Sequence, residues 1–161
     1  MKRILQIICL IALAFGYFRW AVASAARLKA SLSRADRGAV AEMVDFRGFR
    51  KSMGQEWHNA WEKVMVADDP RNAEQIHRGM TEPPPEADDP HILEMMYPDD
   101  KILETILQPG NWDDGKWRSP FAYAITNRLN GTQLILRFGR TGWKLSGIEY
   151  GLAQAREAIH K

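Results

Sequence analysis

The feature that most constrains this chain is an apolar segment that begins at its fourth residue. Lys2 and Arg3 form a short positive start, and residues 4–18 then run almost entirely apolar until Arg19. This layout is typical of a secretory signal, or of a signal anchor that stays in the membrane. The chain therefore divides into residues 1–20, a signal anchor or signal peptide, and residues 21–161, a single domain of ordinary size.

Two fates are compatible with the apolar segment. Small residues after it offer cleavage near Ala23 or Ala25, which would leave the domain periplasmic or secreted. Alternatively the segment stays as an anchor: its fifteen residues span about 22 Å as a helix, so the helix must continue past Trp20 to cross a hydrocarbon core of roughly 30 Å. A predicted helix over 21–33 follows the segment almost directly, so cleavage at these sites would cut into its first turn, which favours the anchor.

The orientation follows from the charges around the segment. A short positive start followed at once by an apolar run favours export, so we expect an inner-membrane protein whose domain faces the periplasm. Five basic residues follow the segment between Arg19 and Arg37. Taken alone, the positive-inside rule would place the domain in the cytoplasm instead.

Charge is distributed unevenly along the chain. Basic residues outnumber acidic ones ten to three in residues 1–51, acidic residues outnumber basic ones fifteen to four in residues 52–115, and basic residues lead eight to two in residues 116–161. Two interpretations follow: the ends and the middle attract each other across the fold, or a basic face lies near the membrane.

The partners expected from these patterns are a membrane and a protein. Residues 4–18 would contact the bilayer, and Arg19, Arg27 and Lys29 would lie near anionic lipid headgroups. The basic residues are scattered and no nucleic-acid module signature is present, so we expect no nucleic-acid partner.

Helical periodicity dominates the chain up to about residue 107. The clearest helix is expected over 45–64, where an aromatic stripe from Phe46 to Val64, including Trp57 and Trp61, should cover a sheet. A proline-rich surface loop is expected at 82–89. The other predicted helices cover 21–33, 36–43, 69–79, 90–97, 101–107 and 152–160.

Strand alternation replaces helical periodicity after Trp117. The pattern predicts strands over 121–126, 134–138 and 143–146, joined by a two-residue turn at Asn130-Gly131 and a second turn at residues 139–142, with a bulge near Gly147. The expected fold is therefore α+β: an N-terminal membrane helix, several amphipathic helices, a three-stranded antiparallel meander and a C-terminal helix.

Three polar residues have expected structural roles. Asp36 and Asp45 stand immediately before predicted helices, where a carboxylate caps free N–H groups. Arg50 lies one turn after Asp45 and is expected to form an ion pair with it.

Ligand or partner contacts are expected at one turn. Trp112 and Trp117 flank Asp113 and Asp114, and exposed tryptophans there would suit a protein or a glycan, whereas buried ones would belong to the core. We expect no metal, cofactor or catalytic residues: the four histidines lack zinc spacing, the paired aspartates lack the alternation of a calcium loop, and no nucleophile stands beside a base.

One stretch carries a resemblance to a known family. Residues 28–53, including Asp36, Val44-Asp45-Phe46 and Arg50, resemble the bacterial family called domain of unknown function 2939, and residues 120–150 resemble its closing strands loosely. The resemblance implies an envelope location and a small helical domain with a meander. It implies no chemistry.

The expected function is a non-enzymatic binding or interaction module of the bacterial envelope, held at the inner membrane. Two alternatives belong to other classes. One is an enzyme with a pocket in a cone-like fold, using buried carboxylates, which the opening helices suggest by analogy only. The other is a secreted protein that acts on another cell.

Overall fold

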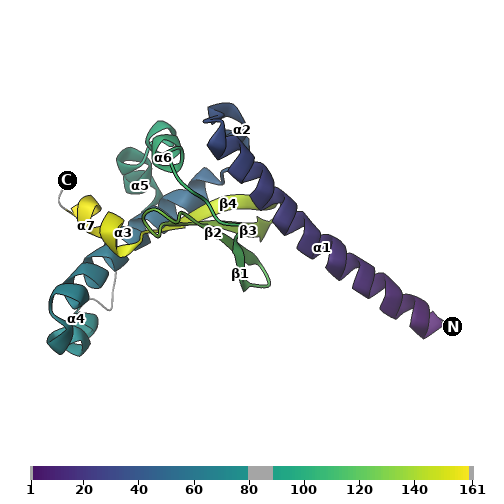
Figure 1. Cartoon of the computed structure of the whole chain (residues 1–161), viewed down its shortest axis with the longest axis horizontal. Helices are drawn as coiled ribbons and strands as arrows, with labels where there is room; N and C mark the ends of the chain where they lie inside the picture. Colours follow the sequence, from purple (N-terminus) through teal and green to yellow (C-terminus); the bar gives the residue numbers. More distant parts are fainter. Residues whose placement is uncertain (1, 80–88, 160–161) are drawn as a thin grey trace.

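The structure, a computed structural model, describes residues 2–79 and 89–159 and has an α+β fold (Figure 1). The helices are α1 (Lys2–Ser33), α2 (Arg37–Met43), α3 (Phe46–Asp68), α4 (Ala73–Gly79), α5 (Pro90–Met96), α6 (Asp99–Ile106) and α7 (Leu152–Ile159), and a short turn, η1 (Pro70–Asn72), precedes α4. The strands are β1 (Lys116–Ser119), β2 (Ala122–Thr126), β3 (Gln133–Gly139) and β4 (Gly142–Glu149). The predicted fold class is confirmed. The predicted loop at 82–89 lies, apart from Asp89, outside the described residues.

The antiparallel sheet has four strands in the order β1-β2-β3-β4, not the three that the sequence predicts. The missed strand, β1, has only four residues and lies at the sheet edge, and only Trp117 among them is even half-buried. Such a strand shows no alternation of apolar and polar residues. The predicted turn between β3 and β4 is present, with Gly139 paired to Gly142, and the predicted bulge is Ser146, beside Gly147.

The predicted two-residue turn at Asn130-Gly131 is wrong. The N–H of Asn127 donates to the carbonyl of Thr132 at 2.7 Å, so residues 128–131 form a longer loop between β2 and β3. The Asn127 side-chain oxygen also accepts a hydrogen bond from the N–H of Leu129 at 3.0 Å. The buried Asn127 thus shapes this loop together with the Asn-Gly pair: the Asn130 side chain accepts a bond from the Thr132 N–H at 3.0 Å, and Gly131 has a φ of +75°.

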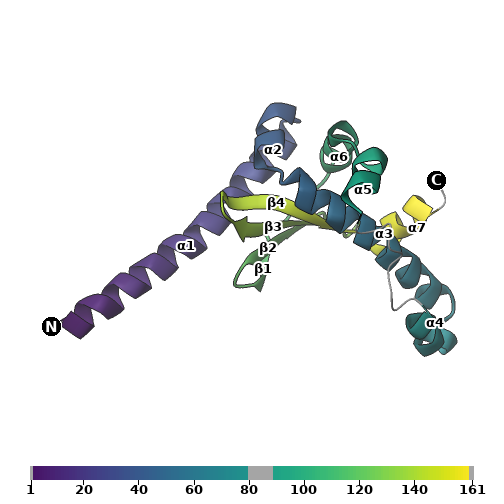
Figure 2. The same cartoon turned by 180° about the vertical axis from the view of Figure 1, so that it is seen from behind.

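The hydrophobic core lies between one face of the sheet and the helices. Alternate strand residues point into it, as period-two geometry requires, and α3 runs beside β4, where the N–H of Asp45 donates to the carbonyl of Leu145 at 2.8 Å (Figure 2). The strand residues of the core are Tyr123, Ile125, Leu134, Leu136, Trp143, Leu145 and Ile148.

Helix α1 belongs to two environments. Its second half packs on the domain through a stripe of buried residues at helical spacing, Ala21, Ala25, Leu28 and Leu32, which is the stripe that the sequence predicts. Its first half leaves the domain as a rod (Figures 1 and 2), and its apolar side chains are exposed. Within the described residues, one helix, Ile4–Ser33, is long and apolar enough to cross a membrane.

The buried stripe of α3 differs from the predicted one. Phe49, Met53, Ala60 and Val64 are buried, whereas Trp57 is 46% exposed. The cause is that α3 extends beyond the end of the sheet. In this extension, the small side chain of Ala60 allows α7 to pack closely through Ala155. The Trp57 ring, on the neighbouring face of α3, is then left at the protein surface.

Candidate membrane-facing site

An aromatic cluster joins α1 to one end of the sheet. The hydroxyl of Tyr17 donates to the carbonyl of Pro120 in the β1–β2 turn at 2.7 Å, and its ring lies 5.0 Å from that of Phe138, measured between centroids. The ring of Phe18 contacts Trp117 edge-on at 4.9 Å. Edge-to-face pairs at these distances stabilise beyond the area that they bury. The β1–β2 turn is thereby fixed beside α1 at Tyr17.

The β3–β4 turn reaches the same part of α1. Gly142 has a φ of +95°, and a Cβ added there would lie 2.7 Å from the ring of Trp20. Only glycine allows both this backbone conformation and the close approach of the ring. Both hairpin turns therefore lie alongside the point at which α1 leaves the domain.

This end of the domain exposes aromatic rings. Phe121, at the β1–β2 turn, is 64% exposed, and Phe18, Trp20 and Phe138 are exposed as well. Tryptophan, here Trp20, concentrates where a protein meets the headgroup level of a membrane. We call this surface the aromatic end; the sequence signal for it was the alternation of β3, which places Phe138 on the face of the buried Leu134 and Leu136, at the last turn of the hairpin.

A groove with a volume of about 680 Å³ lies beside the aromatic end, between the start of α3 and the β3–β4 hairpin. We call it the basic groove, because Lys51, Arg137, Arg140 and Lys144 line it together with a single carboxylate, Asp45. Sequence reasoning missed it. The sequence feature that could have indicated the groove is the presence of two basic residues, Arg137 and Lys144, at polar positions of adjacent predicted strands.

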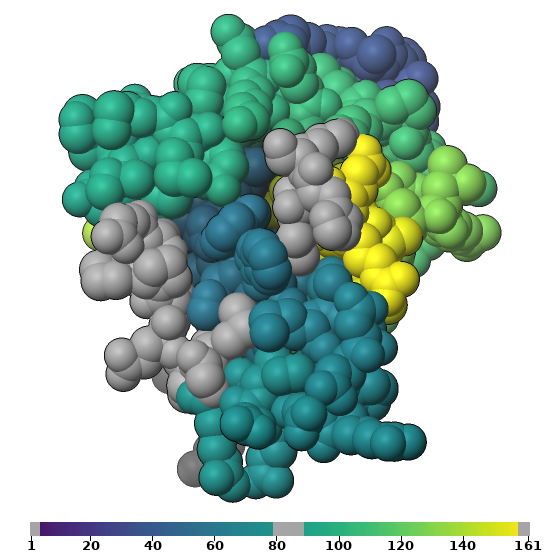
Figure 3. Space-filling view, turned by 90° about the vertical axis from the view of Figure 1, so that its left-hand side faces the viewer, coloured from purple at the N-terminus to yellow at the C-terminus, as the bar shows by residue number. Residues whose placement is uncertain are grey.

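A second groove, of about 610 Å³, lies at the opposite end of the domain, between α3, α6 and α7. Figure 3 looks onto this end, with α7 in yellow beside α3 in blue and the helices α5 and α6 in green. Trp57, Met96, Tyr97 and Tyr150 give it an aromatic and thioether lining. We call it the distal groove. Such linings suit an apolar ligand or the side chains of a protein.

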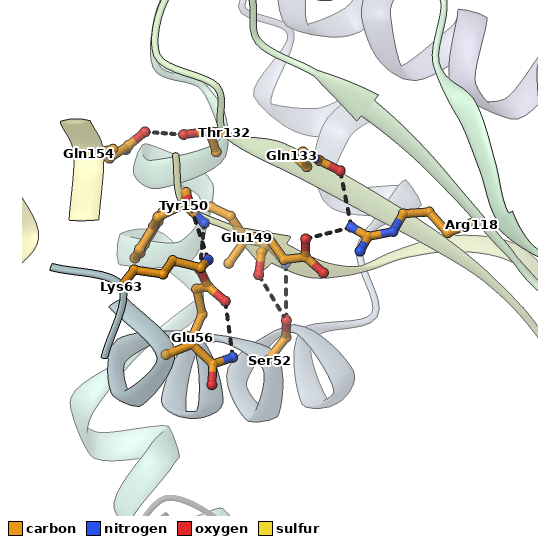
Figure 4. Close-up of polar contacts among 11 residues, drawn as sticks. Ser52, Glu56, Lys63, Arg118, Thr132, Gln133, Glu149, Tyr150 and Gln154 are labelled. Atoms are coloured by element: carbon orange, nitrogen blue, oxygen red, sulfur yellow. Dashed lines mark hydrogen bonds and ion pairs between the residues drawn. The ribbon is translucent and has the colours of Figure 1, made fainter. Parts of the chain in front are cut away.

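A buried carboxylate ties α3 to the end of β4 (Figure 4). Glu56 is 2% exposed, and its carboxylate accepts hydrogen bonds from Lys63 Nζ at 2.6 Å, from the Tyr150 N–H at 2.7 Å and from Asn59 Nδ2 at 3.3 Å. One turn earlier, the hydroxyl of Ser52 accepts a bond from the Ile148 N–H at 3.1 Å. This arrangement is a structural bracket: the N–H groups of Tyr150 and Ile148 join the end of β4 to α3, and side chains of α3 itself complete the hydrogen bonding of Glu56.

The phenol of Tyr150 stands in the distal groove next to this bracket. Burial raises its pKa to about 12, and the neighbouring Tyr97 and the Glu56 carboxylate add to the effect. Each cause disfavours the phenolate. The groove therefore presents a neutral phenol at physiological pH.

The four predicted contact residues lie in three environments. Trp112 and Trp117 are half-buried and pack against the core, and Trp117 belongs to the aromatic cluster. The Asp113 carboxylate accepts bonds from the N–H groups of Gly115 at 2.9 Å and Thr126 at 2.8 Å. The two tryptophans thus have contacts within the fold, and a role for them in partner binding stays a prediction.

Asp114 has its own partner, Lys29 of α1. The two charged groups lie 2.8 Å apart, and the hydrogen bond from Lys29 lowers the pKa of Asp114. Arg27 pairs with Glu42 at 3.2 Å, and Arg19 lies over the ring of Phe15, 5.8 Å from its centroid. Two of the three residues expected near lipid headgroups are therefore paired with carboxylates of the domain. Their contact with lipid stays a prediction.

The three polar residues with expected structural roles lie at helix starts and at a helix junction. Asp36 accepts a bond from the Ala39 N–H at 3.0 Å at the start of α2, and Asp45 accepts one from the Gly48 N–H at 3.1 Å at the start of α3. Arg50 does not pair with Asp45.

The Arg50 side chain reaches instead to the junction of α5 and α6. It donates to the carbonyl of Tyr97 at 3.0 Å and forms an ion pair with Asp99. Arg50 points this way because it lies on the side of α3 that faces α5 and α6, whereas the Asp45 side chain turns back to the start of α3.

Within residues 2–79 and 89–159, no three His, Cys, Asp or Glu side chains lie together as metal ligands would. Comparison of the chain with protein-family models, curated proteins and solved structures gives no match.

Proposed function

We propose that this chain is a membrane-anchored binding module of the bacterial envelope, held against the inner membrane by its aromatic end. The observation that carries the proposal is α1, a single helix of 32 residues that begins apolar and exposed and ends in the core. A helix built in this way couples a membrane segment rigidly to a domain. The resemblance of residues 28–53 to domain of unknown function 2939 is in keeping with the envelope location.

An anchor is favoured over a cleaved signal by what α1 contacts. Cleavage near Ala23 or Ala25 would remove Tyr17 and Trp20 from the aromatic cluster and Ala21 from the core. A released periplasmic or secreted domain would then expose the sheet residues that these side chains cover. The periplasmic orientation rests on the short positive start of the chain.

The binding surface that we assign to this module is the distal groove, and the partner class is protein. Trp57 is 46% exposed and Met96 is 52% exposed, at the end of the domain remote from the aromatic end. Exposed tryptophan and methionine are enriched at protein interfaces and anchor them. A domain fixed at the membrane would present this groove away from the bilayer.

The enzyme alternative has weaker support. It calls for buried carboxylates in a pocket, and among the described residues Glu56 is the one buried carboxylate. Both of its oxygens accept hydrogen bonds from groups of the fold itself. A general acid or base needs an oxygen that can reach a substrate, so a binding role agrees better with this geometry.

A photocrosslinking residue tests the binding surface. Placed at position 57 of the full-length chain in cells, it should give a discrete protein adduct. Placed at position 74, on the exposed face of α4, it should give none. The absence of an adduct at position 57, or equal adducts at both positions, would contradict the assignment.

A reporter fused to the C-terminus tests the orientation. A phosphatase that folds only outside the cytoplasm should be active in the fusion and should be recovered with membranes. Activity of a cytoplasm-restricted reporter at the same position would show the reverse orientation.

A further inference from the structure

The basic groove carries more positive charge than its own carboxylate neutralises. Its four cationic side chains are Lys51, Arg137, Arg140 and Lys144. The single lining carboxylate, Asp45, already accepts the hydrogen bond that caps α3. Even with Lys51 left aside, the other three cations exceed this carboxylate by two charges, and a surface hollow with such an excess attracts anions more strongly than scattered surface charges do.

Two of these cations oppose each other directly across the sheet. Arg137 of β3 and Lys144 of β4 are cross-strand partners. Like charges at such a position destabilise a sheet. An anion bound between them would remove that repulsion.

The hydrogen-bond partners of these two side chains are neutral. Arg137 Nη1 donates to the carbonyl of Ser146 at 3.1 Å, and Lys144 Nζ donates to the carbonyl of Glu42 at 2.6 Å. Arg140, at the tip of the β3–β4 turn, is exposed and has no carboxylate partner in the described part of the chain. The positive charge of all three therefore remains available to a ligand.

The groove adjoins the aromatic end. Phe138 and the residues of the β3–β4 turn line the groove, and the same turn rests on Trp20 of α1. If α1 is anchored, Trp20 lies near the headgroup level, since tryptophan concentrates there. The cations of the groove then lie within reach of lipid phosphates.

We propose that the basic groove binds the phosphate of an anionic phospholipid headgroup, with Arg137, Arg140 and Lys144 as its ligands. Guanidinium groups suit this chemistry because their donors match two phosphate oxygens at once. The proposal rests on the membrane anchoring proposed above. It assigns the headgroup contact to the groove, whereas the cations of α1 at Arg27 and Lys29 are paired within the domain.

Native mass spectrometry of the full-length chain tests this. The protein is released from detergent in the presence of phosphatidylglycerol and phosphatidylcholine with identical acyl chains. We expect the wild-type chain to retain phosphatidylglycerol preferentially. A basic residue near an anionic surface contributes about 1 kcal/mol, roughly fivefold in affinity. Arg140→Gln should therefore weaken retention about fivefold, and Arg137→Gln combined with it about thirtyfold.

Two variants keep the result interpretable. Arg140 is exposed at the tip of the β3–β4 turn, so Arg140→Gln should leave thermal unfolding unchanged even if the double variant is destabilised. The matched control is Arg71→Gln with Arg128→Gln, which removes the same charge from exposed positions outside the groove. The control should retain phosphatidylglycerol as the wild-type chain does.

Three results would overturn the proposal: equal retention of the two lipids by the wild-type chain, unchanged retention by Arg140→Gln, or loss of the bound lipid to inorganic phosphate alone. The last would indicate a site for a free phosphate instead of a lipid. Fractionation of the same cells separates this test from that of the anchor. A soluble chain would fail the anchoring proposal, whereas a membrane-bound chain without lipid preference would fail only this one.

Discussion

Glu56 shows how a single residue joins two parts of this fold. Its buried carboxylate receives the backbone N–H of Tyr150 and the ammonium of Lys63. Glu56→Ala would leave that N–H without a partner in a buried place, and we expect a loss of about 2–3 kcal/mol in the free energy of unfolding. Urea unfolding of the full-length chain measures it. Glu74→Ala, which removes an exposed i, i+4 pair with Arg78, is the control and should cost less than about 0.5 kcal/mol. Equal losses would contradict the bracket.

Tyr150 predicts a dependence of stability on alkaline pH. Its pKa in the folded chain is about 12, above the ordinary value of 10. A raised pKa means that the contribution to stability is complete below pH 10 and is lost as the pH rises through about 12. We expect the free energy of unfolding of the wild-type chain to fall by about 2 kcal/mol more than that of Tyr150→Phe over this range. Parallel curves for the two proteins would refute this.

Single residues were predictable from sequence where their role is local. Asp36 and Asp45 cap helices that begin at the next residue, so neighbours in the chain carry the signal. The partner of Arg50 was not predictable, because Asp99 lies 49 residues away and is brought near only by packing. The same holds for the groove formed by α3 and the β3–β4 hairpin.

At the scale of elements, α1 depends on small residues where it crosses the sheet. Ala25 is 1% exposed, whereas Ala26, its neighbour on the other face, is exposed. Ala25→Leu should overpack this contact and cost about 1–3 kcal/mol in the free energy of unfolding, and Ala26→Leu should be nearly neutral. Thermal unfolding of both variants measures the difference. Similar unfolding temperatures would mean that this half of α1 is not part of the core.

The repeat of apolar residues predicted most helices and strands, and it missed the strand that has no such repeat. Helix α3 and strands β2 to β4 have clear apolar repeats, and the sequence located them. Strand β1 is short and mostly exposed, so its pairing with β2 gives no pattern. Trp57 belongs to the predicted stripe of α3 but is exposed. The sequence pattern does not show where the sheet ends beneath α3.

At the scale of the molecule, part of the uneven charge of the chain is neutralised by ion pairs within the fold. Ion pairs join the basic ends to the acidic middle: Arg37 with Asp100, Arg50 with Asp99, and Arg156 with Asp68. The interpretation that the ends and the middle attract each other across the fold is therefore correct for these residues. Three cations of the basic groove, Arg137, Arg140 and Lys144, form no ion pair with a carboxylate in the part of the chain that the structure describes.

Anchoring and headgroup binding both require α1 to be one helix that serves as membrane anchor and as part of the core. The intact mass and N-terminal sequence of the protein recovered from cell membranes test this most directly. We predict a membrane-bound species that retains residues 4–25, including Tyr17 and Trp20. A soluble species that begins just after Ala23 or Ala25, and that unfolds as cooperatively as the full-length chain, would contradict it.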